Sequence, residues 1–196
     1  MKKALNLLGV MVVLGMLFGV AKADQVAFVA TLTGSQEVPP NASPGIGSAL
    51  VTLDTTTNLI TINTSFAGLL SPTVAAHIHC CTPPGANAMV ATQIPTFPGF
   101  PLGVTTGTYL QTFDLTQAST YNPAFITAHG GTVEGAMAAF IAGLLNGQTY
   151  LNIHTAQFPG GEIRGQLNQV PEPATLLLMG TGLMAAVGVI RKRVKR

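Results

Sequence analysis

Positive charge is nearly absent from the body of this chain. Between residues 24 and 169 the only cation is Arg164, against six carboxylates, so this part carries a net charge of −5. The other eight Lys and Arg residues lie in the two terminal segments, and the formal net charge of +2 for the whole chain reflects those segments. Because binding to a phosphate backbone needs clustered Lys and Arg, this distribution excludes nucleic acid as a partner.

The common catalytic motifs are missing as well. The chain contains no Gly-x-Ser-x-Gly elbow, no His-Glu-x-x-His zinc motif and no phosphate-binding loop. It also lacks the paired carboxylates that chemistry on a polysaccharide usually needs. We therefore expect a structural or ligand-binding protein without enzymatic activity.

Both ends of the chain have the composition of targeting segments. Residues 1–23 combine a basic start, an apolar stretch and a small-residue cleavage site, which predict a signal peptide removed after Ala23. An uncleaved membrane anchor is the alternative. Residues 174–190 are 17 uncharged residues, near the lower limit for a membrane-spanning helix. The basic tail, residues 191–196, stays on the cytoplasmic side, so residues 24–169 face outward.

The pattern of residues 24–169 predicts an all-β domain. Short segments alternate between apolar and polar residues and are separated by turns rich in Gly, Pro, Asn and Thr. This favours an antiparallel β-sandwich of about seven strands with one inserted α-helix. We expect strands at 25–33, 47–54, 59–66, 74–81, 105–115, 149–155 and 162–168. The helix is expected over 132–146, with Thr132 as cap and Gly147 as stop, whereas 82–103 and 116–128 are expected to be irregular.

Three of the four histidines lie in these strand segments. His77 and His79 belong to one strand and His154 to a later one. Alternation places both imidazoles of the first strand on one face. The opposite, apolar face of that strand carries Val74, Ala76 and Ile78.

The pattern of histidines favours two interpretations. A His-x-His pair and a third His on a neighbouring strand would bind copper or zinc, since imidazole is a good ligand for both. The alternative is a buried polar network that fixes the sheet in register. In either case we expect Asn152, Glu162 and Arg164 close to His154. Glu162 would orient an imidazole or Arg164 would hold an acidic sugar or carboxylate, whereas His129 lies in a loop outside the cluster.

Cys80 and Cys81 are the only cysteines. An exported domain meets oxidising conditions, so a disulfide between these neighbours, an intermolecular bridge and thiolate ligation of a metal are all open. We favour the disulfide between neighbours. Because side chains alternate along a strand, Cys81 shares the face of His77 and His79 and is the better candidate for a further metal ligand.

The end of the chain resembles the PEP-CTERM sorting signal. The resemblance rests on Pro171, Glu172 and Pro173, followed by the apolar segment and the basic tail. It implies export, transient anchoring in the inner membrane and cleavage near the Pro-Glu-Pro motif by an exosortase. The released protein would reach the cell surface or the extracellular polysaccharide matrix; a permanent anchor is the alternative.

The body of the chain resembles the CHRD domain. The matching segments are 28–40, with its Gly-Ser-Gln-Glu-Val-Pro-Pro ending, the His-Ile-His segment at 77–79, and 150–167, with its Phe-Pro-Gly-Gly-Glu-Ile-Arg-Gly turn and strand. The resemblance implies a β-rich extracellular module with no established enzymatic activity. Its partners would be polysaccharide or other surface proteins, as in a biofilm. The chain departs from the commoner pattern after His79, where Cys80 and Cys81 replace Gly.

Overall fold

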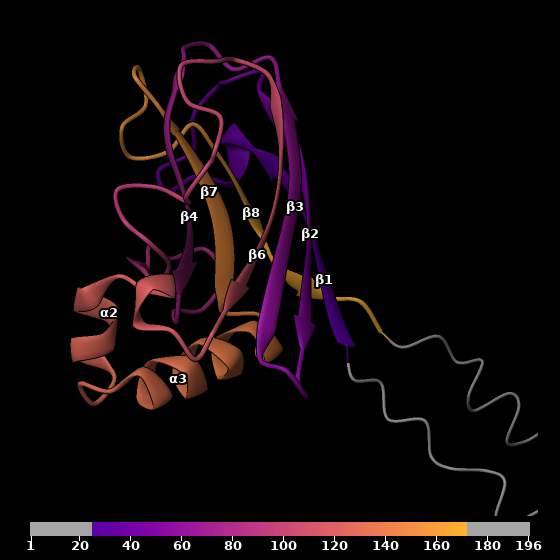
Figure 1. The fold of residues 1–196 in the computed structure, drawn as a ribbon. Coiled ribbons are helices and arrows are strands. Elements are labelled where there is room, and N and C mark those ends of the chain that lie inside the picture. Colours follow the sequence, from indigo (N-terminus) through magenta and orange to yellow (C-terminus); the bar gives the residue numbers. More distant parts are fainter. Residues whose placement is uncertain (1–24, 172–196) are drawn as a thin grey trace, which may run out of the picture.

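The computed structural model describes residues 25–171, which form one nine-stranded antiparallel sheet with two helices at one end (Figure 1). The strand order is β5-β4-β7-β8-β1-β2-β3-β6, and β9 lies beside β1. The strands are β1 (Gln25–Thr33), β2 (Ile46–Asp54), β3 (Leu59–Ala67), β4 (Thr73–Cys80), β5 (Met89–Val90), β6 (Gly107–Asp114), β7 (Thr149–Thr155), β8 (Ile163–Gln166) and β9 (Asn168–Gln169). The helices are α2 (Pro123–Ala128) and α3 (Val133–Leu145), with short 3-10 turns η1 (Gly34–Gln36) and η2 (Ala118–Thr120).

The sheet curls so that β4, β7 and β8 lie opposite β2, β3 and β6 (Figure 1). The apolar faces of both halves meet in one core, with Phe28, Ile62 and Ile78 fully or almost fully buried. The predicted all-β, antiparallel class is confirmed, and the two faces of the sandwich belong to a single continuous sheet. All seven expected strands are present within one or two residues at most ends. Strict alternation over nine residues identifies β2 and β3 as half-buried strands.

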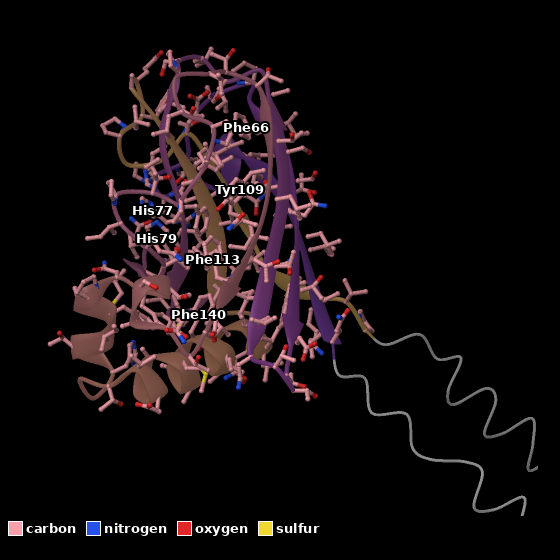
Figure 2. The ribbon with its side chains drawn as sticks, viewed as in Figure 1. Phe66, His77, His79, Tyr109, Phe113 and Phe140 are labelled. Atoms are coloured by element: carbon pink, nitrogen blue, oxygen red, sulfur yellow. A yellow bond between two sulfur atoms is a disulfide. The ribbon has the colours of Figure 1, made fainter. Side chains whose placement is uncertain are left out.

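The long connection from β4 to β6, residues 82–103, packs across the core. The Phe97 ring stacks on Tyr109 and Phe113 of β6, with ring centroids 5.8 and 6.0 Å apart, and Figure 2 labels both β6 rings. The Phe97 amide donates to the Ala76 carbonyl of β4 at 3.2 Å. The connection therefore links the two halves of the curled sheet, and β5 within it pairs with β4.

Two local expectations are wrong. Val74 does not share the buried face of Ala76: it is 45% exposed, because a bulge shifts the register between Thr73 and Ala75. Residues 116–128 are not irregular, since they contain η2 and α2. Asn122 caps α2 by accepting from the Ala124 amide at 3.0 Å, and Pro123 occupies the first turn, where a missing N–H costs nothing.

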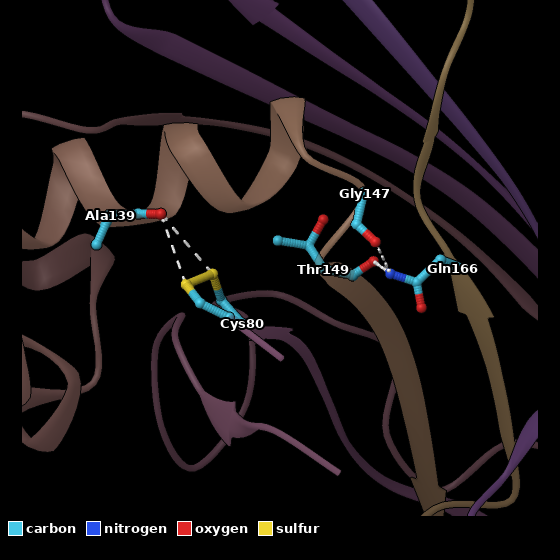
Figure 3. Close-up of a disulfide and its surroundings, with 6 residues drawn as sticks. Cys80, Ala139, Gly147, Thr149 and Gln166 are labelled. Carbon is cyan, nitrogen blue, oxygen red and sulfur yellow. Dashed lines mark hydrogen bonds between the residues drawn. A yellow bond between two sulfur atoms is a disulfide. The ribbon is translucent and has the colours of Figure 1, made fainter. Parts of the chain in front are cut away.

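Helix α3 lies against a disulfide that joins Cys80 to Cys81 (Figure 3). Thr132 caps the helix by accepting from the Gly135 amide, and Asn146 ends it. The Cys81 sulfur lies 3.5 Å from the Ala139 carbonyl, a van der Waals contact because disulfide sulfurs carry no hydrogen. Gly143 faces both sulfurs, and a Cβ there would overlap Cys80 Sγ and lie 3.1 Å from Cys81 Sγ.

The close approach of α3 to the disulfide predicts the effect of Gly143→Ala. Gly to Ala inside a helix ordinarily stabilises by about 0.5–1 kcal/mol. Here the added methyl group would collide with sulfur, so we expect a loss of roughly 1–3 kcal/mol in the free energy of unfolding, measured by urea denaturation. Gly160→Ala is the matched control because nothing lies within 4 Å of its Cβ position. A stabilising Gly143→Ala would contradict this packing.

Candidate metal centre

Strands β4 and β7 bring three histidines onto one face. In the antiparallel register Ala75 lies opposite His154, His77 opposite Asn152 and His79 opposite Tyr150. Side chains at alternate positions share a face, so the three imidazoles lie together and face away from the apolar core. Figure 2 shows His77 and His79 side by side on β4.

The three imidazoles form a compact cluster. One ring nitrogen of each histidine lies within 4.8 Å of those of the other two. The ring centroids are 5.1 Å apart for His77 and His154, 5.9 Å for His79 and His154, and 6.0 Å for His77 and His79. Each side chain is only 7–8% exposed. No other group of three or more potential metal ligands within 4.8 Å occurs in residues 25–171.

Backbone carbonyls of the covering loops orient each ring. His77 Nε2 donates to the Pro95 carbonyl at 2.7 Å, His79 Nδ1 to Ala88 at 2.8 Å, and His154 Nδ1 to Pro159 at 3.0 Å. A carbonyl only accepts, so these nitrogens carry the hydrogen and the tautomer of each neutral ring is fixed. The second nitrogen of each ring therefore carries a lone pair and no hydrogen. In all three rings it is buried without a hydrogen-bond partner.

Burial keeps the three imidazoles neutral. Desolvation lowers the pKa of His79 and of His154 to about 4, and it lowers the pKa of His77 as well. Repulsion between neighbouring imidazolium charges acts in the same direction on His79 and His154, and Arg164 adds to it at His79. Neutral imidazole is the form that binds a metal ion.

Two residues predicted for the histidine site lie elsewhere. Cys81 is not a metal ligand here, because its sulfur is bonded to Cys80 and faces α3. Glu162 does not orient an imidazole. Its Oε1 accepts from Ser43 Oγ and from the Leu70 amide, both at 2.6 Å, and Oε2 accepts from Thr155 Oγ at 2.6 Å. The residue precedes β8, so strand alternation does not set its direction.

Arg164 reaches the cluster through an aromatic ring. Its Nη1 donates to Asn87 Oδ1 at 2.8 Å and its Nε to the Gln36 carbonyl. The guanidinium lies 4.5 Å from the centre of the Tyr150 ring, and this ring stacks on His79 with centroids 4.7 Å apart. Arg164 was predicted to hold an acidic ligand. Its side chain is only 4% exposed, and two of its N–H groups already donate to protein oxygens.

Asn152 and Glu37 come together at Gly161, and Asn152 shares the histidine face of β7. Asn152 Nδ2 donates to the Gly160 carbonyl at 3.5 Å, which leaves Oδ1 buried without a partner. Glu37 Oε1 is also buried without a partner, and desolvation raises the pKa of this carboxyl to about 7, although Arg164 opposes the rise. A Cβ on Gly161 would lie 2.6 Å from each of these two oxygens.

Sequence reasoning missed Glu37 as a site residue. It follows η1 in a loop without periodicity, so no alternation pattern relates it to His154 more than a hundred residues later. The one signal in the sequence is the Gly160-Gly161 pair. Gly161 has a φ of 130°, which favours glycine, and its backbone lies close to both side chains.

Comparison with protein families decides what the domain is. A family model described as the CHRD domain matches residues 28–167. The chain belongs to the CHRD family. A second model, the PEP-CTERM protein-sorting motif, matches residues 169–193, so both resemblances are confirmed. No curated protein and no solved structure matches the chain significantly.

The order of the two matches identifies the destination of this CHRD domain. A PEP-CTERM motif behind it marks a protein that is exported, anchored in the membrane and processed by an exosortase on its way to the surface. Pro171 ends the described part. Glu172, Pro173, the predicted membrane helix at 174–190 and the predicted signal peptide at 1–23 lie outside it. Within residues 25–171, no helix has the length and apolar character needed to cross a membrane.

The lowered histidine pKa values predict how pH affects the metal-free CHRD domain. In the unfolded chain these imidazoles have a pKa of 6.5 and bind protons as the pH falls below it. In the folded domain His79 and His154 stay neutral down to about pH 4. The free energy of unfolding should therefore fall between about pH 7 and pH 4.5, by roughly 2 kcal/mol for each of these histidines. Glu37, whose folded pKa is raised, opposes part of this loss in the same interval.

Urea denaturation at several pH values after chelation measures this slope. His154→Gln should flatten the slope because it removes one of the titrating groups. His129→Gln is the control, since His129 ends α2 against Phe125, away from the cluster. Equal slopes for both variants would contradict the assignment.

Proposed function

We propose that this CHRD protein is a cell-surface metal-binding protein that holds copper or zinc through His77, His79 and His154. One observation carries the proposal: each buried ring donates one N–H to a backbone carbonyl and leaves its other nitrogen unpartnered. Metal-binding histidines are typically oriented in this way, with the second nitrogen bonded to a carbonyl or carboxylate.

A polar network alone does not account for this geometry. The polar network would bond the rings to Asn152, Glu162 and the backbone; each ring does bond to a backbone carbonyl, but its second nitrogen has no partner. A buried polar atom without a partner costs about 1–3 kcal/mol, so three together are a considerable loss. One cation would satisfy all three lone pairs at once.

The distances fit after a small closure of the rings. Metal–nitrogen bonds of about 2.0–2.1 Å in a tetrahedral site place ligand nitrogens roughly 3.3 Å apart. The three ring nitrogens lie within 4.8 Å of one another, so each needs to move by less than about 1 Å. Imidazole suits both metals, and the usual affinity order of divalent ions favours copper over zinc.

The outer face of the sheet supports a second role, contact with matrix polysaccharide. One row across β1, β2, β3 and β6 consists of exposed hydroxyl side chains, and charge occurs only at the end of these strands. The row comprises Thr31, Ser48, Ser65 and Thr108. Uncharged hydroxyl groups on an exposed sheet face can exchange hydrogen bonds with the hydroxyl groups of a neutral sugar chain. We propose a binding role in the matrix, without catalysis, for this protein.

Metal content tests the first proposal. The exported protein, purified without a tag and dialysed against one equivalent of Cu²⁺ or Zn²⁺, should retain about one ion per chain by elemental analysis. His77→Ala should lose most of it, because two imidazoles hold an ion far less tightly than three. His129→Ala is the matched control and should retain the metal. Wild-type protein without stoichiometric metal, or His77→Ala with full metal, would rule the proposal out.

Sorting to the matrix is tested by mass. After fractionation of the producing cells, we expect the protein in the surface or matrix fraction with a mass that lacks the signal peptide and the residues beyond the Pro-Glu-Pro motif. Deletion of residues 171–173 should leave the longer form in the membrane fraction. A surface form that retains residues 176–196 would contradict exosortase cleavage.

A further inference from the structure

Buried atoms without partners are concentrated at the histidine cluster. Residues 25–171 contain eight buried side-chain nitrogen or oxygen atoms that lack a hydrogen-bond partner. Five of the eight form two adjoining groups: one nitrogen each of His77, His79 and His154, and the pair Asn152 Oδ1 and Glu37 Oε1, in which Asn152 shares the histidine face of β7. Such atoms are rare in folded proteins and are usually partnered by an ordered water molecule or an ion, so five in adjoining groups mark this region as a place to bind one.

The two oxygens extend the cluster in one direction. Asn152 lies directly opposite His77 across the β4–β7 pair and two residues before His154, on the same face of β7. Glu37 Oε1 lies next to Asn152 at Gly161. The side chains of Asn152 and Glu37 are only 2% and 5% exposed, so bulk water does not satisfy them.

The five atoms need two kinds of partner. Lone pairs on the imidazoles need a cation, whereas the amide and carboxylate oxygens accept hydrogen bonds and need a donor. The orientation of the Asn152 amide agrees with this division, since its nitrogen faces the Gly160 carbonyl at 3.5 Å and its oxygen has no partner. A bare ion would leave both oxygens unsatisfied. An ion that carries a water molecule would satisfy all five atoms.

We propose that the metal ion keeps an open fourth position occupied by a water molecule, whose hydrogens are accepted by Asn152 Oδ1 and Glu37 Oε1. This inference rests on the metal site proposed above and specifies its type. Structural zinc sites use four protein ligands, whereas three protein ligands and one water leave a position that other small ligands can take. Small anions that displace water are the expected class of exogenous ligand.

A surface pocket leads to Glu37. Its volume is about 350 Å³, and its lining includes Glu37, Arg164, Gln166, Ser35 and Gly85. Arg164, the only cation of residues 24–169, would attract an anion into this pocket. Glu37 thus lines the pocket and has one oxygen next to Asn152, so in the proposed site it would lie between solvent and the bound water.

Azide binding to the cobalt-loaded protein tests the open position. The exported protein is loaded with one equivalent of Co²⁺, whose visible spectrum reports changes of ligand, and titrated with azide. We expect a saturable spectral change in the unaltered protein. Bound cobalt with no response to azide would overturn the open position and leave the metal site standing. No bound cobalt in a protein that also takes up neither Cu²⁺ nor Zn²⁺ would overturn both.

The Glu37→Gln variant tests the role of the carboxylate. An amide neither accepts as strongly from the bound water nor repels an anion, so azide should bind about tenfold more tightly than in wild type, with cobalt content unchanged. Glu134→Gln, an exposed carboxylate on α3, is the matched control and should behave as wild type. Equal azide affinity in all three proteins would overturn the role of Glu37.

Discussion

The bonds from imidazole rings to backbone carbonyls are the constraint on which the candidate site depends. Ala88 and Pro95 belong to the connection between β4 and β6, and Pro159 belongs to the turn between β7 and β8. Two separate loops therefore determine which nitrogen of each ring is free. The strands supply the positions of the histidines, and the loops supply their tautomers and remove them from water.

The same loops connect this face to the rest of the fold. The connection that supplies two carbonyls also places Phe97 against β6 in the core. The loop that covers the histidines is therefore held in place by core packing on the other side of the sheet. The turn that supplies the third carbonyl contains Gly161, where Asn152 and Glu37 come together. The rigidity of the cluster is thus a property of the core and the loops jointly.

Alternation in the sequence predicts the strands and the shared face of His77, His79 and His154, because the period of a strand is fixed by its backbone. Glu37 could not be found in this way, since its approach depends on how a loop folds over a distant turn. Cys81 failed as a ligand because a bond to its neighbour overrides the alternation that placed it on the histidine face. Glu162 failed because the regular strand begins one residue later. The two-residue period of a strand predicts where a side chain points only inside the regular strand.

The disulfide beneath α3 has a consequence for when the protein matures. Cytoplasmic reductants keep thiols reduced, so we expect the bond between Cys80 and Cys81 to form only after the chain has crossed the membrane. This bond closes the end of β4, immediately after His79, and provides the surface on which the helix rests. The binding face of the proposed metal site would then be completed only after export, so the chain would not capture cytoplasmic metal during its synthesis.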